Sequence, residues 1–588
     1  MMGRSLGLLL LCAAALAHGG SARTQQGPGG TQITIVPTGG SGRPDLGPEG
    51  GPTTESDRAR RHTWEIWWSY NREYYLARRA RGSPVTGVHA TDDKKQRADL
   101  REGRLFDVLL GALEDKDKDV RSSAAVALGK FGVSKGVRGA LERHVNVPPE
   151  GWPDVREGSI YGTGLLALGE NRHFLDTIAW DKDRPAREES IALVGLMMDG
   201  TRESADLLVR HARYFHSGAA SGPEQPPQRA EQERRRFATH LLGFVEPDVG
   251  AYDDFLWQVA CGGRGWDVGE QSMAITALGR RRAKAFKGQL FKTLYERGAD
   301  RNLARSAAIA LGMMLGPDDE DDLKRLARFV RDTRGDTIAQ NFAVMSLGQV
   351  GGDTAVALLK DLVRVFGDEE DRAFVYLALG LCGARSEAAR DELLVAYRRA
   401  DTEVEQGVLA LACGIARVKD AVPLTVEALE KPRKRDTPGL GARGRFAGWA
   451  ALGLGFHGDG RGLAAAKKVL GQSNDPFVRE QAAVAVSLLM RSAAVEDLMA
   501  ILKDAGTLHA KAAVVVALGV LPEPTPAAVD ALISVYKDDS MPNTVRALAI
   551  CALGALAEPR PVAVSALLVR NYNYFVRCLA LDEIASYL

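Results

Sequence analysis

The chain has 588 residues, and its 76 basic side chains nearly balance its 75 acidic ones. A net charge this close to zero gives no support to a general polyanion-binding role, so nucleic acid is not an expected partner. Aromatic residues make up only 6% of the chain, which suits a helical array built from Ala, Leu and Gly.

Residues 1–22 have the features of a signal peptide for export. Arg4 supplies a positive start, residues 6–17 form an apolar run, and Ala15-Leu16-Ala17 fits a cleavage site, with Gly20-Ser21-Ala22 as an alternative. The run is too short for a comfortable transmembrane helix. We expect an exported protein, periplasmic or secreted, without a membrane span once the signal is removed. An uncleaved segment that anchors an envelope component is the alternative.

Two atypical segments follow. Residues 23–61 are rich in Gly and Pro and predict a disordered tether, because they cannot bury a core. Residues 62–99 hold the densest aromatic cluster and predict an N-terminal capping segment, since terminal repeats must differ from internal ones. Exposed aromatic side chains also anchor interfaces, so the same cluster is a candidate partner-binding site. Its candidate residues are Trp64, Trp67, Trp68, Tyr70 and Tyr74.

A short phrase then returns throughout residues 100–588. Val120-Arg121 is followed by Ala127-Leu128-Gly129, and the same elements come back as Val545-Arg546 and Ala552-Leu553-Gly554. Between Gly243 and Gly380 the steps are 36, 33, 36 and 32 residues. A fixed period of this size is typical of a solenoid.

Each copy of the phrase contains two helical patterns. Val120, Ala124, Ala127 and Leu128 share one face of a first helix, and the Gly after them stands where a helix can end in a left-handed turn. Asp or Asn residues precede the first helices as expected N-caps, among them Asp119, Asn302, Asp401 and Asp475. A second helix carries apolar residues at Ala355, Leu358, Leu359, Leu362 and Val363. One hairpin cannot bury its own apolar face, so neighbours must stack.

These residues resemble the HEAT family, and the short steps are most similar to the HEAT-like repeats of phycobilin lyases. The resemblance implies an all-α fold, a right-handed α-α superhelix of about 12–13 helical hairpins. The aromatic-rich tail that begins at residues 571–575 predicts a C-terminal cap. The whole chain is similar to exported bacterial HEAT-repeat proteins. Because the repeat is similar to that of the lyases, a chromophore-lyase-like enzyme or chaperone factor is an alternative to a binding protein. The lyases share only the repeat with this chain.

Two insertions interrupt the array. Residues 217–236 are rich in Pro and predict a loop. Residues 431–445 predict a basic loop, which is either a solvated turn or a contact for an acidic partner. The candidate partner-binding residues of the second insertion are Lys431, Arg433, Lys434, Arg435, Arg443 and Arg445. A third basic group, residues 280–287, predicts an exposed turn.

Catalytic and metal-binding patterns are missing from the sequence. The histidines are scattered, with no His-Glu-x-x-His pair, and neither a Gly-x-Ser-x-Gly elbow nor a Walker loop occurs. The acidic run at residues 318–322 predicts a solvated turn that caps a helix. Five cysteines follow the signal segment at long spacings and predict buried free thiols. We therefore expect no catalytic residues, cofactor or metal, and a non-catalytic protein-binding scaffold.

Overall fold

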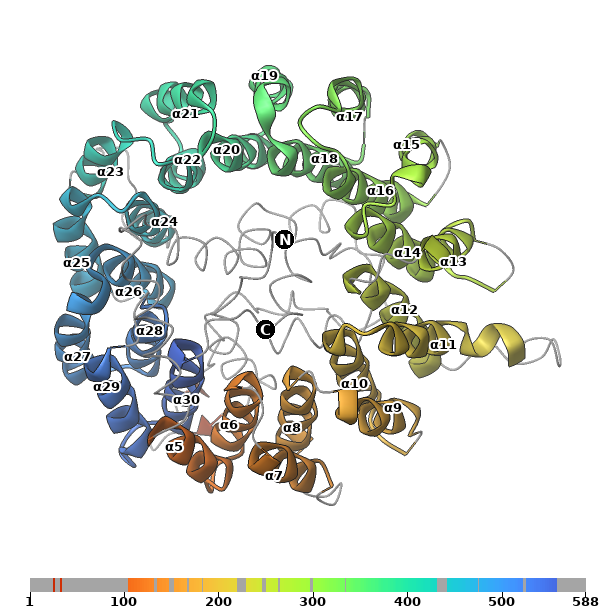
Figure 1. The fold of residues 1–588 in the computed structure, drawn as a ribbon. Coiled ribbons are helices and arrows are strands. Elements are labelled where there is room, and N and C mark those ends of the chain that lie inside the picture. The colour runs from red at the N-terminus through yellow and green to blue at the C-terminus, as the bar shows by residue number, and fades with distance from the viewer. Residues whose placement is uncertain are drawn as a thin grey trace, which may run out of the picture. The chain divides into compact units, whose positions relative to one another are not determined.

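The protein is an all-α solenoid in the computed structural model (Figure 1). The structure describes residues 25–26, 32–33, 104–131, 135–146, 153–166, 169–181, 183–218, 229–245, 250–262, 265–296, 300–333, 335–430, 442–473, 475–521 and 525–557. Two short strands, β1 (Gln25–Gln26) and β2 (Gln32–Ile33), pair antiparallel. The predicted aromatic cap, most of the tether and the C-terminal tail lie outside the described residues.

Helices α6 to α29 pair into twelve hairpins within this described part of the chain. The first helices are α6 (Lys118–Phe131), α8 (Pro153–Leu165), α10 (Ala186–Asp199), α12 (Arg229–Leu241), α14 (Val268–Arg280), α16 (Arg301–Met314), α18 (Thr337–Val350), α20 (Glu369–Gly383), α22 (Glu403–Ala416), α24 (Ala442–His457), α26 (Pro476–Met490) and α28 (Leu508–Gly519). The second helices are α7 (Lys135–Val145), α9 (Arg172–Trp180), α11 (Arg202–Gly218), α13 (Gly250–Ala260), α15 (Lys287–Tyr295), α17 (Glu320–Asp332), α19 (Gly352–Leu362), α21 (Glu387–Arg399), α23 (Ala421–Glu430), α25 (Leu463–Gln472), α27 (Ala494–Asp504) and α29 (Pro526–Lys537).

Two further helices stand before and after these hairpins, α5 (Arg104–Leu113) and α30 (Asn543–Ala557). Short 3-10 helices fill several turns: η1 (Gly169–Asn171), η3 (Leu242–Phe244), η4 (Lys284–Phe286), η5 (Gly460–Gly462) and η6 (Arg491–Ala493). The number of hairpins agrees with the spacing of the repeated phrase.

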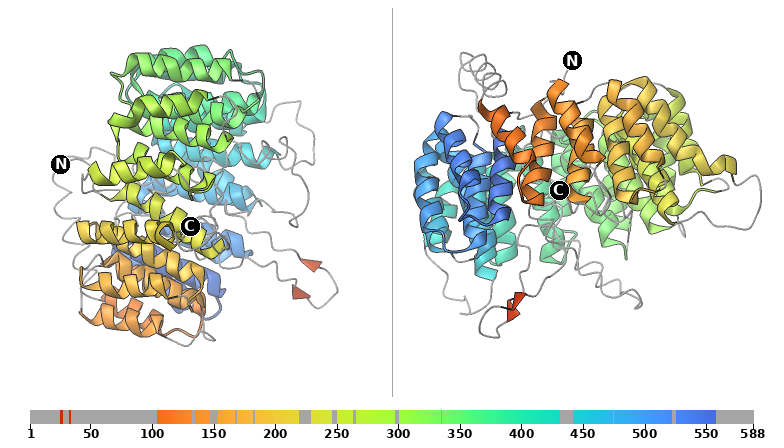
Figure 2. Two further views of the ribbon diagram at one scale, coloured as in Figure 1. Left: turned by 90° about the vertical axis from the view of Figure 1, so that its right-hand side faces the viewer. Right: turned by 90° about the horizontal axis from the view of Figure 1, so that it is seen from below.

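The described helices fall into two compact units. Residues 104–162 and 422–557 belong to unit 1, and residues 163–421 form unit 2. Within each unit the first helices pack on one another in one row, and the second helices form a second row beside it. Figure 2 shows neighbouring helices lying side by side along these rows. Unit 1 therefore brings together the beginning and the end of the repeat array.

The predicted apolar faces are the faces that the structure buries. Val120, Ala124, Ala127 and Leu128 of α6 are all fully buried. In the second helix α19, Ala355 and Leu359 are equally buried. Since a hairpin alone would expose these faces, their burial depends on the neighbouring hairpins.

The glycine of the phrase does not end its helix in a left-handed turn, which corrects the prediction, since the left-handed glycines are others such as Gly200 and Gly458. Gly129 lies inside α6, which continues to Phe131. A Cβ atom added to Gly348 of α18 would lie only 2.7 Å from Cα of Ala378, in α20 of the next hairpin. The glycine therefore lets two first helices approach closely, and this contact outweighs the roughly 1 kcal/mol that glycine costs inside a helix.

The phrase has a different register in α24. The sequence indicated Ala451-Leu452-Gly453 as the local copy, but Gly455 is the residue whose added Cβ would meet Ala485, 2.7 Å from its Cα. The contacting copy is therefore Gly453-Leu454-Gly455. The turns after the first helices use other glycines in left-handed backbone, such as Gly200 and Gly458.

Three of the four named N-caps are shifted from their predicted positions. Asp475 caps α26 as expected, because its side chain accepts from Val478 N–H. Asp117 caps α6 in place of Asp119, Asp300 caps α16 in place of Asn302, and Thr402 caps α22 in place of Asp401. Runs of adjacent capping residues make several start positions equivalent at the level of sequence.

Helix α30, the last one in the described part of the chain, packs on α6 of the first described hairpin within unit 1. A Cβ added to Gly554 of α30 would lie 2.7 Å from Cβ of Ala127 in α6, so the last copy of the phrase contacts the first as sequence neighbours contact each other. Helix α5 packs on both α6 and α30. We call this contact of α29 and α30 with α5 and α6 the clasp.

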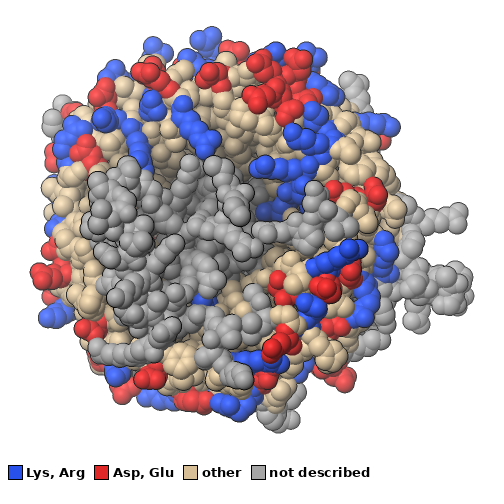
Figure 3. Space-filling view, in the orientation of Figure 1, with Lys and Arg blue, Asp and Glu red and all other residues tan. Residues whose placement is uncertain are grey.

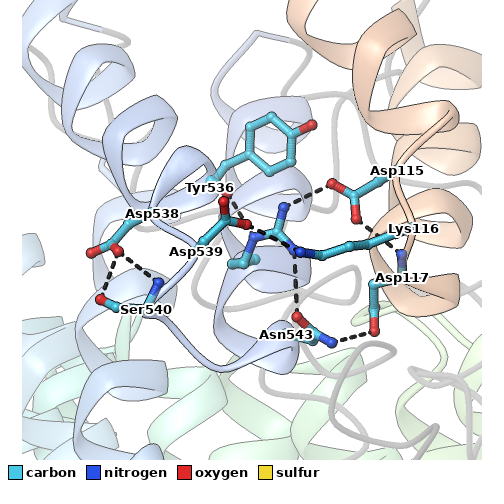
Figure 4. A network of polar contacts seen from close by, with 9 residues as sticks. Asp115, Lys116, Asp117, Tyr536, Asp538, Asp539, Ser540 and Asn543 are labelled. Atoms are coloured by element: carbon cyan, nitrogen blue, oxygen red, sulfur yellow. Dashed lines mark hydrogen bonds and ion pairs between the residues drawn. The ribbon is translucent and has the colours of Figure 1, made fainter.

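Polar side chains join the turns on the two sides of the clasp (Figure 4). The buried Arg546 guanidinium donates to Asp115 Oδ2 at 2.7 Å. Asn543 Nδ2 donates to Asp117 Oδ2 at 2.7 Å, and the exposed Lys116 ammonium lies 3.4 Å from Asp539. Asp117 also caps α6, so one side chain both caps α6 and binds α30.

Candidate interaction surfaces

Most of the predicted partner-binding residues lie outside the described part of the chain. These are Trp64, Trp67, Trp68, Tyr70 and Tyr74 of the aromatic cluster, and Lys431, Arg433, Lys434 and Arg435 of the basic insertion. They stay predictions.

The basic insertion is shorter than predicted, because α24 begins at Ala442. Arg443 and Arg445 therefore lie in a helical first turn and not in a loop, and Arg445 is exposed. Arginine is a strong helix former, and the buried face of α24 starts soon afterwards at Trp449, which packs edge-on against Phe477 with ring centroids 4.9 Å apart. Arg445 therefore belongs to the exposed start of α24.

The first insertion also ends earlier than predicted, because α12 begins at Arg229. Three consecutive arginines of α12 extend toward acids of neighbouring helices. Arg234 lies 3.4 Å from Glu189, Arg235 lies 2.7 Å from Glu270, and Arg236 lies 2.5 Å from Asp267. Arg234 and Arg235 are buried, so this part of the predicted loop belongs to the interior of unit 2.

Ion pairs between successive hairpins recur along unit 2. Arg305 of α16 donates to both carboxylate oxygens of Asp336, at 2.9–3.2 Å. Asp336 also caps α18 by accepting from Ala339 N–H. Arg372 pairs with Glu405 of the following hairpin at 2.8 Å. These side chains hold the array together and are occupied in doing so.

The basic turn between α14 and α15 divides into internal and exposed residues. Arg280 lies over the Phe244 ring, and the Arg281 guanidinium pairs with Asp253. Lys287 binds Asp319 and Asp322 of the acidic run. Two basic residues of the turn, Arg282 and Lys284, are exposed.

In the view of Figure 3, Lys and Arg gather over α14 and α16, and Asp and Glu gather over α17. The two charge types thus occupy neighbouring parts of this face. The acidic part matches the run at residues 318–322, where α17 begins at Glu320 and Lys287 binds two of the carboxylates. An acidic partner would therefore meet attraction and repulsion close together on this face.

Three arginines occupy backbone conformations that favour glycine. Arg282, Arg417 and Arg491 have φ values of 54°, 58° and 57°, each in the turn after a first helix where Gly200 and Gly458 serve elsewhere. A left-handed backbone costs a non-glycine residue about 1–2 kcal/mol. Arg282 and Arg417 share a local pattern, since each is exposed and is followed by a buried apolar residue and an exposed lysine.

A histidine and a carboxylate that the sequence did not indicate as neighbours meet in unit 2. His211 Nε2 lies 3.1 Å from Asp176 Oδ1, and its ring stacks on Trp180 with centroids 4.2 Å apart. Burial lowers the pKa of His211. Asp176 also accepts from Arg210 and from Trp180 Nε1, and the His211 side chain has no exposed surface. The imidazole of His211 is therefore buried beneath Asp176 and Arg210, of which Asp176 is 15% exposed and Arg210 54% exposed.

The described cysteines are free thiols. Cys382, Cys413 and Cys551 are buried as predicted, and Cys261 is exposed. Burial raises the pKa of Cys382 and of Cys551 to about 12. Within the described ranges no group of three or more His, Cys, Asp or Glu side chains is placed to hold a metal ion, and no helix is long and apolar enough to cross a membrane.

No protein-family model matches the chain, and no curated protein matches it in sequence. Solved structures that match it are HEAT/armadillo-type helical-repeat proteins. One is importin beta, with 13% identity over 89% of this chain and 77% of that chain, at a TM-score of 0.37.

Kap121p bound to Nup53p matches with 13% identity over 91% of this chain and 62% of Kap121p, at a TM-score of 0.33. The chain thus spans less than two thirds of Kap121p. Human deoxyhypusine hydroxylase matches with 16% identity over 54% of this chain and 96% of that chain, at a TM-score of 0.21. The chain is similar to these proteins in being a helical-repeat array.

Proposed function

We propose that this protein is an exported, non-catalytic scaffold that binds other proteins along the surface of its solenoid. The observation that carries the proposal is that one set of residues holds the helices together while another set is exposed. The repeated Val, Ala, Leu and Gly residues are buried in the stack, and the arginines of the first helices pair with acids of the next hairpin. The turns and the helix ends next to the insertions present exposed, chemically varied side chains on this frame.

Stacked hairpins create an extended surface, which is how solenoid proteins bind their partners. Exposed Arg282 and Lys284 in unit 2 and exposed Arg445 in unit 1 are cationic contacts on such surfaces. The basic residues 431–435 immediately precede α24 in the sequence, and the aromatic residues Trp64 to Tyr74 precede the array. We place the contact with an acidic partner segment at the basic insertion and an apolar contact at the aromatic cluster.

Chemical cross-linking in the cell envelope, followed by capture of a tagged full-length chain, tests the binding role. The double variant Lys434→Glu, Arg435→Glu should recover the partner at least tenfold less well than the wild type. The matched control is Arg398→Glu, Arg399→Glu, an adjacent exposed pair at the end of α21, which should retain the partner. Failure of the wild-type chain to enrich any protein above a tag-only sample contradicts the scaffold role.

N-terminal sequencing of the mature protein tests the export route. Cleavage after the two candidate signals gives chains that begin at His18 or Arg23. A chain that keeps residues 1–22 favours the anchored envelope component. An intact mass that exceeds the sequence mass by one equivalent of a bound chromophore favours the lyase-like alternative.

A further inference from the structure

The clasp lacks a direct chain connection. Asn543 and Asp117 are 426 positions apart in the sequence, whereas Arg305 and Asp336 are 31 apart. At the junction between α16 and α18, the outer helix α17 and its two turns connect the contacting helices, so the chain restricts how far they can separate. At the clasp, α5 is continuous with α6, and α29 is continuous with α30. Each side of the clasp can therefore leave as a complete layer.

When the clasp opens, water can hydrogen-bond with the polar side chains that joined its two sides. The side chains of Lys116 and Asp539 are already 75% and 78% exposed. The Arg546 and Asp115 side chains are 6% and 9% exposed while the clasp is closed, and opening restores hydration to both charges together. Breaking such a pair by separation is therefore less costly than deleting one partner in place.

We propose that the clasp is a reversible gate, which opens as a local step while the hairpins on both sides stay folded. Local opening of this kind has a free energy between zero and that of global unfolding. An open clasp presents the small-residue faces of α6 and α30, which are buried against each other in the closed state.

A cysteine within the clasp reports on its opening. Cys551 of α30 is buried and hydrogen-bonds with Ser123 of α6. Cys382 and Cys413 are buried in α20 and α22 of unit 2, and the Cys382 thiol donates to the carbonyl of Gly348 in the preceding first helix α18. These two thiols are internal controls, because they require separation of ordinary junctions. Cys261 is exposed and gives the rate of unhindered labelling.

The test is maleimide labelling of the native full-length protein, with the labelled fraction of each cysteine followed over time by peptide mass spectrometry. Cys551 should react at least tenfold faster than Cys382 and Cys413 and more slowly than Cys261. Arg546→Ala should accelerate Cys551 at least tenfold further. Arg305→Ala, which removes the equivalent arginine of an ordinary junction, should leave the rate at Cys551 unchanged.

Equal rates at Cys551, Cys382 and Cys413 in the wild type would overturn the proposal, because the clasp would then open only in global unfolding. A milder variant covers the case in which Arg546→Ala fails to fold. Lys116→Glu places like charges at an exposed pair, and it should accelerate Cys551 two- to fivefold with no change at Cys413. No acceleration in a folded Lys116→Glu protein would also contradict the gate.

Discussion

The junction between α16 and α18 and the clasp between α30 and α6 use the same chemistry with different connectivity. Arg305 donates to Asn302 and to Asp336 of the next layer, and Arg546 donates to Asn543 and to an acid of the next layer, Asp115. The exposed fractions of the paired side chains are 9% and 11% in the first case and 6% and 9% in the second. Both junctions also bring a glycine against a small residue.

The comparison teaches that stacking in this array does not depend on chain order. At both junctions a first helix meets a neighbour that offers a small residue to a glycine and a carboxylate to an arginine. The chain connection between two contacting helices decides only how those helices can separate. An ordinary junction cannot separate without strain in its hairpin, whereas the clasp can separate as two folded layers.

Removal of the carboxylate that pairs with the buried arginine should have the largest effect on the free energy of unfolding. Asp336→Ala leaves Arg305 buried without its main partner and also removes the cap of α18, so we expect the unfolding free energy of unit 2 to fall by about 3–5 kcal/mol. Asp115→Ala should cost less, because Arg546 regains water when the clasp opens. Urea unfolding followed by circular dichroism measures both. Equal losses would show that connectivity does not matter.

Replacing a glycine at a close contact between helices by leucine should have an intermediate effect on stability. A Cβ at Gly348 or at Gly554 would lie 2.7 Å from a neighbouring carbon, and overpacking of this kind costs about 1–3 kcal/mol. Gly348→Leu should lower the melting temperature in calorimetry by more than Gly554→Leu, which the clasp relieves by opening. Gly111→Leu is the control, since an added Cβ there has no neighbour within 4 Å. A large loss at Gly111 would invalidate the steric explanation.

A pH-dependent effect at the clasp should be the smallest. Burial raises the pKa of Asp119 from 3.8 to about 6, with nearby Asp117 and Asp154 adding to the shift and Lys118 opposing it. Because the folded-state pKa is the higher one, the protonated carboxyl stabilises the fold below pH 4, and this contribution is lost as the pH rises through 6.

Asp119→Asn should therefore be more stable than the wild type at pH 7, by about 1 kcal/mol after allowance for partial exposure. The difference should disappear at pH 4. Asp371→Asn is the counterpart at an ordinary junction, where burial also raises the pKa of the acid although Asn341 donates to it. Thermal melts of each pair between pH 4 and 8 provide the measurement. A wild-type advantage at pH 7 would contradict the assigned shift.

The sequence predicted the helical array because each hairpin repeats the same local pattern. The helix-forming residues and the 3.6-residue spacing of Val120, Ala124, Ala127 and Leu128 are local properties, and they survive without knowledge of the neighbours. The predicted insertions at residues 217–236 and 431–445 were too long at their C-terminal ends. The three arginines at positions 234–236 were assigned to a loop, because the sequence does not show that their acidic partners lie on other helices of the fold.

The glycine of the phrase shows why a periodic residue can be assigned the wrong role. Its position after Ala-Leu fits a helix end as well as a close helix contact, and only the neighbouring helix separates the two. The same holds for His211 and Asp176, which are 35 positions apart. Neither residue type nor spacing indicated that they would meet beside Trp180.

The sequence by itself determined the all-α solenoid, the number of hairpins and the faces that they bury, because these follow from local periodicity and from the need to cover each apolar face. Only the tertiary structure decided which side chains pair across hairpins and that α30 packs on α6. The reason is that the contacts at the clasp join residues more than 400 positions apart, and no local pattern encodes where a stack of similar layers meets its own beginning.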